Sequence, residues 1–149
     1  MKFAQKADEV LITYSLGSCA GLTLYDPTQR VGVLLHCLLP LSNIDAKRAA
    51  ENPYMFTDTG VASALDTMFK LGARRNSIIA KVAGCGSPLA STPAFNIGER
   101  NWTVTRKVLW KNDILIAGQD VGGDAARTLI LRMDTGKTFV KARGSEVEL

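Results

Sequence analysis

The sequence predicts an α+β fold, a mixed α/β sandwich in which β-rich sheets pack with two main helices. Short apolar and β-branched segments, bounded by Gly, Pro, Asn and Asp, outnumber the helical segments. Only two long stretches repeat their apolar residues with the period of an amphipathic helix. A chain of 149 residues with 46% apolar and 21% charged residues fits one domain, residues 1–149, that buries roughly two-thirds of its unfolded surface.

The first third of the chain is predicted to be strand. Residues 10–14 are apolar and β-branched, and residues 22–25 alternate between apolar and polar side chains. A turn at 26–29, with Pro27 at its second position, joins the second of these segments to the apolar run at 30–38. The two segments on either side of this turn therefore form a hairpin whose strands are largely buried.

Helices and strands alternate in the rest of the chain. Helices are expected at 45–52, at 57–71 with Thr57 or Asp58 as its cap and Gly72 as its end, and from 96 or 98 to 111. Strands are expected at 77–82, 114–119, 128–133 and 138–141, with turns at 84–88, 122–123 and 134–137 and a loop at 89–95. The tail at 144–149 is expected to be frayed.

Composition and charge argue against several classes of protein. The longest apolar run, residues 31–35, is far too short to span a membrane, and no apolar segment follows the N-terminal lysines as in a secretory signal. The net charge of +4 comes from scattered cations, and aromatic residues make up only 7%, which argues against a nucleic-acid-binding surface. We therefore expect a soluble cytoplasmic protein whose mild positive field favours an acidic protein partner.

The three cysteines, Cys19, Cys37 and Cys85, are expected to be reduced, because an odd number does not form the paired framework of a secreted domain. Together with His36 they are the set from which a metal site would be built. His36 and Cys37, however, are neighbours that point to opposite faces of a strand. The glycine turn at 84–88 lacks the Lys-Ser/Thr pair of a phosphate-binding loop. We expect no metal and no cofactor, and interpret Cys85 as structural or incidental.

Cys19 and His36, the only histidine, form the candidate catalytic pair. Cys19 follows a Gly17-Ser18 turn between two strand-like segments. An adjacent imidazole is expected to bring the pKa of a thiol well below its ordinary value of about 8.5, so the pair indicates acyl transfer by a thiolate. If the hairpin turn is centred between residues 27 and 28, Cys19 lies opposite His36, with Cβ atoms about 4.5–5.5 Å apart. A different turn length changes this register.

Thr13, Gly17 and Ser18 complete the candidate site. The Thr13 hydroxyl would hold the imidazole in its reactive tautomer, and the Gly17-Ser18 turn would leave backbone amides free to bind an oxyanion. Each residue also has a plain structural explanation, since threonine is a β-former and lone cysteines or histidines are commonly core residues. The joint placement favours catalysis, because a buried imidazole needs a hydrogen-bond partner for each ring nitrogen.

A series of short motifs runs through nearly the whole chain. They are residues 16–19 (LGSC), 31–36 (VGVLLH), 39–40, 81–84, 96–98 with Arg100 and Asn101, 120–123 with Arg127, and 135–136. In this order they resemble the CheD family of chemoreceptor glutamine deamidases. The chain departs from the family pattern at Phe56, Cys85 and Ala126, none of which belongs to the candidate triad.

The resemblance implies a bacterial chemotaxis enzyme of the cytoplasm that hydrolyses the side-chain amide of receptor glutamines to glutamate. It implies a Cys-His-Thr triad, with Cys19 as nucleophile, His36 as general base and then acid, and Thr13 as orienting residue. It further implies a cysteine thioester intermediate, which some family members also form from receptor methyl esters. The implied partners are the cytoplasmic domains of chemoreceptors and a CheC-type phosphatase.

Two other functions stay open on the sequence alone. A non-catalytic signalling module would bind receptors or a phosphatase through its surface and would not need the Cys19 thiol. A general cysteine protease or transglutaminase would share the thiol but would need an extended peptide cleft.

Overall fold

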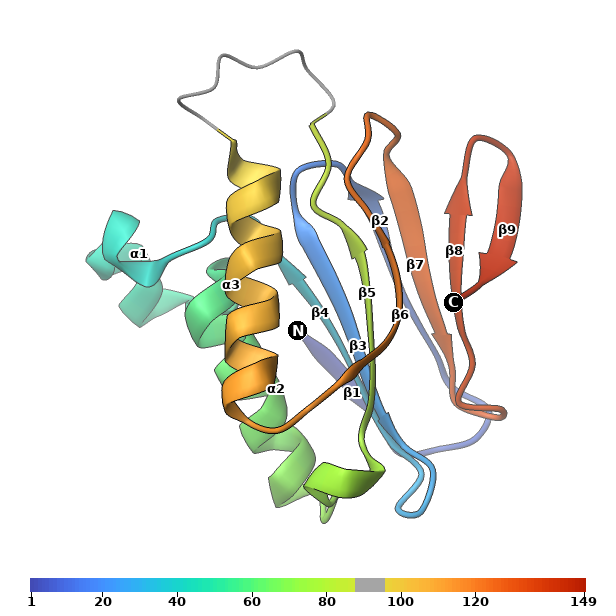
Figure 1. Ribbon diagram of the computed structural model, residues 1–149. Coiled ribbons are helices and arrows are strands. Elements are labelled where there is room, and N and C mark those ends of the chain that lie inside the picture. The colour runs from blue at the N-terminus through green and yellow to red at the C-terminus, as the bar shows by residue number, and fades with distance from the viewer. Residues whose placement is uncertain (88–95) are drawn as a thin grey trace.

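Two β-sheets pack face to face, and the two long helices cover the outer face of one of them (Figure 1). The structure is a computed structural model that describes residues 1–87 and 96–149. The helices are α1 (Ala46–Glu51), α2 (Thr57–Lys70) and α3 (Ile97–Lys111), with short 3-10 turns at Ser42–Ile44, Pro53–Met55 and Arg75–Ser77. The arrangement confirms the predicted α+β class.

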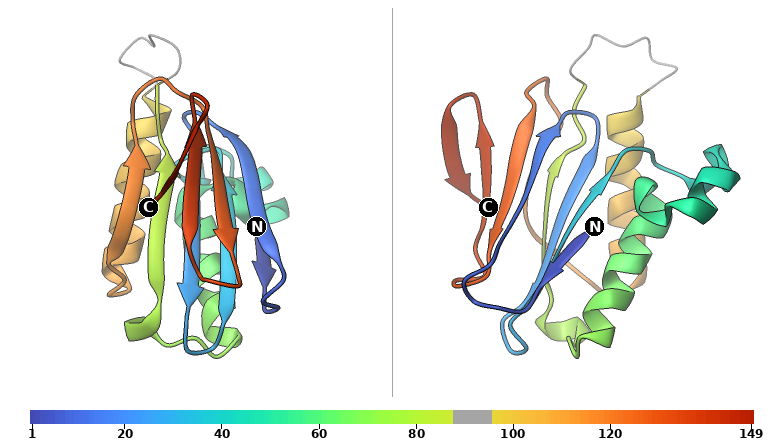
Figure 2. Two further views of the ribbon diagram at one scale, coloured as in Figure 1. Left: turned by 90° about the vertical axis from the view of Figure 1, so that its right-hand side faces the viewer. Right: turned by 180° about the vertical axis from the view of Figure 1, so that it is seen from behind.

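The five-stranded sheet has the order β1-β4-β3-β5-β6 and the four-stranded sheet the order β2-β7-β8-β9. The strands are β1 (Lys2–Ala4), β2 (Val10–Leu16), β3 (Ala20–Asp26), β4 (Val31–Cys37), β5 (Ile79–Gly84), β6 (Ile116–Val121), β7 (Arg127–Arg132), β8 (Thr138–Ala142) and β9 (Ser145–Glu148). Within the five-stranded sheet only β5 and β6 run parallel, as expected for a pair joined through a helix. The views in Figure 2 show the resulting order of layers, which is helices, five-stranded sheet and four-stranded sheet.

Side chains alternate along β4 between the helix side of the five-stranded sheet and the inter-sheet side, which faces the four-stranded sheet. Val33, Leu35 and Cys37 belong to the large core that α2 completes. Leu34 belongs instead to a smaller core with Leu131 of β7. His36, one residue before Cys37, therefore points to the inter-sheet side. Every residue of β3 is buried, because both faces of this strand are covered.

Most elements lie where the sequence predicts them, but two expectations are wrong and one strand was not predicted. The tail is not frayed, because Ser145–Glu148 forms β9 and pairs antiparallel with β8. The short strand β1 was not expected. The N-cap of α2 is Phe56, without a side-chain hydrogen bond, so neither Thr57 nor Asp58 caps this helix. The loop expected at 89–95 lies outside the described residues.

The register of the β3–β4 hairpin also differs from the expectation. His36 lies opposite Gly21, and Cys19 falls two residues before that position, just ahead of β3. The turn is centred one residue later than expected. The reason is that the Asp26 carboxylate accepts hydrogen bonds from the backbone N–H groups of Thr28, at 2.8 Å, and Gln29, at 3.1 Å. A shift of two residues keeps a side chain on the same face, so Cys19 and His36 still share the inter-sheet side.

A β-bulge in β2 shapes the same region. Thr13 pairs with Leu129 and Leu16 with Arg127, so two residues of β2 oppose one of β7. The second bulged residue, Ser15, has a φ of 58°. The extra residue changes the phase of the side chains, which lets Leu16 and Thr13 both point to the inter-sheet side although they are three residues apart.

Candidate functional site

Thr13 and His36 meet across the two sheets. The Thr13 Oγ1 of β2 lies 2.8 Å from the His36 Nδ1 of β4. This contact occupies one ring nitrogen, so the other, Nε2, is the nitrogen that can exchange a proton with a neighbouring group. The structure therefore brings together two members of the candidate triad, which come from different sheets.

Cys19 is half-buried between β2 and β3 and lies on the same side of the sheet as His36. Its side chain packs against the inter-sheet cluster that contains Leu16 and Leu129. By the register, Cys19 is the diagonal neighbour of His36, for which separations of about 7–8 Å, and somewhat less between the Cβ atoms, are usual. Within residues 1–87 and 96–149, no hydrogen bond joins Cys19 to His36. The expected direct pairing of these two residues is thus replaced by a diagonal one.

The backbone around Cys19 is held by three hydrogen bonds to successive carbonyl groups. Gly86 N–H donates to the Gly17 carbonyl at 2.7 Å, and Cys85 N–H donates to the Cys19 carbonyl at 2.7 Å. Between them, the Asn101 Nδ2 donates to the Ser18 carbonyl at 2.9 Å. Gly17 and Ser18, the two expected oxyanion residues, therefore form a well-anchored segment rather than a free turn.

Two glycines allow the chain to approach this segment. A Cβ at Gly84 would overlap the carbonyl oxygen of Cys19, and a Cβ at Gly98 would overlap the carbonyl oxygen of Gly86. Gly84 also has a φ of 93°, which L side chains rarely adopt. The ends of β5 and α3 thus reach the Cys19 segment only because these positions lack side chains.

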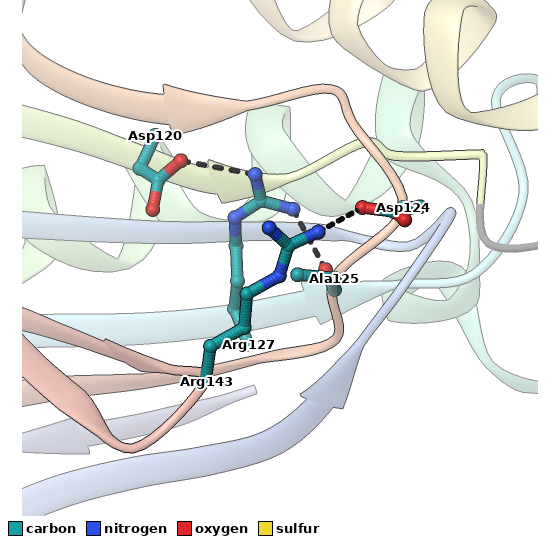
Figure 3. Close-up of polar contacts among 5 residues, drawn as sticks. All are labelled: Asp120, Asp124, Ala125, Arg127 and Arg143. Carbon is teal, nitrogen blue, oxygen red and sulfur yellow. Dashed lines mark hydrogen bonds and ion pairs between the residues drawn. The ribbon is translucent and has the colours of Figure 1, made fainter.

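Arg127 anchors the turn between β6 and β7 (Figure 3). Its guanidinium donates to Asp120 at 3.0 Å and to the Ala125 carbonyl at 2.9 Å, and Arg143 pairs with Asp124 of the same turn. The turn between β6 and β7 then accepts a hydrogen bond from Ser87 N–H at its Gly123 carbonyl, at 2.7 Å. Arg127 therefore fixes the turn on which residues 84–87 rest.

The charge states of the site differ from the expected thiolate. Burial raises the pKa of the Cys19 thiol above its ordinary value, and its own backbone N–H acts against this rise. Burial lowers the pKa of His36 below 6.5, and the positive N-terminal amino group lowers it further. At neutral pH the site therefore holds a neutral thiol and a neutral imidazole. Such a site needs a base to remove the thiol proton during attack.

The other two cysteines are buried and lie in the core on the helix side. The Cys37 Sγ donates to the Phe56 carbonyl at 3.5 Å. Burial raises the pKa of both Cys37 and Cys85 to about 12. In the part of the chain that the structure describes, no group of three His, Cys, Asp or Glu side chains is arranged to hold a metal ion.

Sequence reasoning missed Asn101 and Thr57 as parts of this region. Asn101 and Thr105 are buried with Leu109 on one stripe of α3. A polar residue on the buried stripe of a helix was the available signal, because such a residue needs internal hydrogen-bond partners. The Thr57 hydroxyl, expected to cap α2, donates instead to the Asn101 Oδ1 at 2.9 Å.

Among the described residues, no helix is long and apolar enough to cross a membrane.

Comparison with known proteins gives consistent matches. Residues 38–142 match the family model described as CheD chemotactic sensory transduction. The chain is 44% identical over 142 residues to the probable chemoreceptor glutamine deamidase CheD of Solibacter usitatus strain Ellin6076, covering 95% of this chain and 84% of that protein. It is 43% identical over 143 residues to the probable chemoreceptor glutamine deamidase CheD 1 of Syntrophus aciditrophicus strain SB, covering 96% and 89%.

A third relative matches over a similar length, and all three matches span the candidate triad. The probable chemoreceptor glutamine deamidase CheD of Symbiobacterium thermophilum is 40% identical over 147 residues, covering 97% of this chain and 88% of that protein. The family model begins to match after His36, whereas this alignment includes the segment that carries Thr13, Cys19 and His36.

Proposed function

Because the chain belongs to the CheD family, we propose that it hydrolyses the side-chain amide of chemoreceptor glutamines to glutamate, releasing ammonia. The observation that carries this proposal is the Thr13–His36 hydrogen bond beside the anchored Cys19 segment. It supplies an oriented imidazole on the side of the sheet where the thiol lies. The names of the relatives supply the substrate class.

His36 acts as the general base in this mechanism. When the Thr13 hydroxyl accepts from Nδ1–H, the lone pair of Nε2 is free to take the thiol proton. The Cys19 sulfur then bonds to the amide carbon, and the carbonyl oxygen becomes an oxyanion. This assignment suits a thiol with a raised pKa, because the proton leaves only as the S–C bond forms.

The same imidazole completes both halves of the reaction. The protonated His36 gives its proton to the departing nitrogen, and the C–N bond breaks. Ammonia departs, and the acyl group stays on Cys19 as a thioester. A water molecule deprotonated by His36 then attacks the thioester carbon. The C–S bond breaks, glutamate is released, and the proton returns to the thiolate of Cys19.

The surroundings of the enzyme follow from the same family membership. We propose that residues 1–149 act as one domain in the cytoplasm, where the cytoplasmic domains of chemoreceptors are accessible. A CheC-type phosphatase is the proposed protein partner. The net charge of +4 suits an acidic surface on either of them.

Two matched cysteine variants test the proposed activity. Cys19→Ala should abolish ammonia release from a purified receptor cytoplasmic fragment, whereas Cys37→Ala removes a thiol on the helix side and should leave release unchanged. Mass spectrometry of the fragment should show single deamidations and no backbone cleavage, which separates a deamidase from a protease. Undiminished release by folded Cys19→Ala would contradict Cys19 as the nucleophile, whereas receptor binding without ammonia release by the wild type would favour the non-catalytic module.

A further inference from the structure

The carbonyl groups of residues 17–19 all accept hydrogen bonds, and among the described residues a side chain donates only to the middle one. Asn101 donates its Nδ2 to the Ser18 carbonyl at 2.9 Å and to the Leu38 carbonyl at 3.2 Å. Ser18 precedes Cys19, and Leu38 follows His36 by two residues. One amide of α3 thus joins the segment of the thiol to the end of the strand that carries the imidazole.

The orientation of this amide is fixed by its partners. Asn101 is fully buried. Two carbonyl oxygens face its nitrogen, and carbonyl oxygens only accept, so the atom toward them is the donor Nδ2. The Thr57 hydroxyl donates to Oδ1 at 2.9 Å on the other side. Both hydrogens and the oxygen of the amide are therefore used, which makes this a satisfied buried network.

The Ser18 carbonyl determines where the next backbone N–H points. A trans peptide is planar, so its C=O and N–H point in opposite directions. When Asn101 holds the Ser18 carbonyl toward α3, the N–H of Cys19 must point away from α3. In the described part of the chain, no protein carbonyl or side chain other than the thiol of Cys19 itself accepts from this N–H. The N–H thus lies on the side of the reacting sulfur.

We propose that Asn101 is a positioning residue, which fixes the Ser18–Cys19 peptide so that the Cys19 N–H donates to the oxyanion formed during glutamine hydrolysis. The inference rests on the proposed function and adds a residue to it. Asn101 does not touch the reacting atoms. It acts through the peptide, whose N–H is oriented before substrate arrives, as effective oxyanion sites require.

The variant Asn101→Ala separates this role from general support. The Gly17 and Cys19 carbonyls keep their backbone donors, so the thiol stays in place while the Ser18–Cys19 peptide is released. We expect kcat for ammonia release to fall about 100- to 1,000-fold, as for loss of an oxyanion donor, with KM within about twofold. The rate of Cys19 alkylation by iodoacetamide at high pH, where the thiolate is fully formed, should stay unchanged, because alkylation forms no oxyanion.

A milder pair of variants keeps the test independent of the folding of Asn101→Ala. Thr57→Val removes the donor to the Asn101 Oδ1 and should lower kcat about threefold to tenfold, the value of one weakened hydrogen bond. Thr23→Val is the matched control. It removes a similarly buried hydroxyl, which lies 3.0 Å from the Thr138 hydroxyl and is remote from the site. This variant should leave kcat unchanged.

Distinct results overturn the two proposals. The role of Asn101 is overturned if kcat of Asn101→Ala stays within about threefold of the wild type, or if Cys19 alkylation falls in parallel with kcat. A crystal structure of Asn101→Ala tests the peptide without activity. A turned or split Ser18 carbonyl supports the proposal, and an unmoved one contradicts it. Undiminished ammonia release by Cys19→Ala overturns the role of Cys19 in the proposed function, whereas the Ser18 carbonyl in the Asn101→Ala crystal structure is read independently of activity.

Discussion

Cys19 and Cys37 lie on opposite sides of the five-stranded sheet, and their surroundings differ accordingly. Cys37 packs against α2 in the large core, donates to a backbone carbonyl and has a pKa of about 12. Cys19 is half-buried on the inter-sheet side, next to a histidine oriented by a threonine. The comparison teaches that Cys37, next to His36 in the sequence, points away from it into the large core, whereas Cys19, distant in sequence, lies on the same side of the sheet as His36.

Removing the His36 imidazole should have the largest effect on activity, because only the Cys19 side of the sheet carries this base. His36→Ala should lower kcat for ammonia release about 100- to 10,000-fold, because the neutral Cys19 thiol then loses the group that accepts its proton. Circular dichroism and thermal melting should show a folded protein. A variant that retains more than a tenth of the activity would contradict the role of His36 as general base. The presence of His36 would then not distinguish the Cys19 side of the sheet from the Cys37 side.

The backbone support of Cys19 can be tested with two glycines that both have positive φ. Gly84→Ala introduces a Cβ against the Cys19 carbonyl, whereas Gly144→Ala, at a φ of 82°, meets no atom. We expect Gly144→Ala to cost about 1 kcal/mol of unfolding free energy from backbone strain and Gly84→Ala about 1–3 kcal/mol more. Urea unfolding measures both. Equal losses would show that the close approach at Cys19 is not tight.

The threonine that orients the imidazole should have a smaller effect than the imidazole itself. Thr13→Val keeps the β-branched shape but removes the hydroxyl that bonds the His36 Nδ1. We expect kcat to fall about tenfold, the equivalent of one hydrogen bond, with an unchanged melting temperature. Activity equal to that of the wild type would leave Thr13 as a plain strand residue.

The pH dependence of cysteine alkylation and of ammonia release should show the smallest effect, and it is specific to the pKa values of Cys19 and His36. The raised pKa of Cys19 predicts a midpoint of iodoacetamide alkylation above the ordinary thiol value of about 8.5, and Cys37 should not react until the protein unfolds. The lowered pKa of His36 keeps its base form present down to below pH 6.5, so ammonia release should fall only as the pH drops through that lower value. An alkylation midpoint below about 8.5 would instead indicate a thiolate–imidazolium pair.

Local sequence signals were sufficient for most elements but not for how they pair. Periodicity located α2, α3 and most strands, because a helix or strand leaves its pattern in contiguous residues. The hairpin register was wrong by two positions, since the Asp26 side chain determines the turn and the pattern of apolar residues does not. The assignment of β2 to a different sheet from β3 depends on pairing with the distant strand β7, which no local pattern encodes.

The candidate site could be predicted in its members but not in its supports. Cys19, His36 and Thr13 carry recognisable chemistry, and the structure joins Thr13 to His36. Asn101 signalled only a polar residue on a buried helix stripe, because its two carbonyl partners are distant in sequence and near only in the fold. The pKa of Cys19 was expected in the wrong direction, since burial depends on the packing of the two sheets.

The Thr13–His36 hydrogen bond has a consequence for partly unfolded states. Its two residues belong to separate sheets, so the bond exists only while the sheets are docked face to face. A molten globule that keeps its strands but loosens side-chain packing would retain its far-UV spectrum and lose the bond. Under mild acid or denaturant, ammonia release should therefore disappear before secondary structure does, which makes enzymatic turnover a sensitive indicator of native tertiary structure.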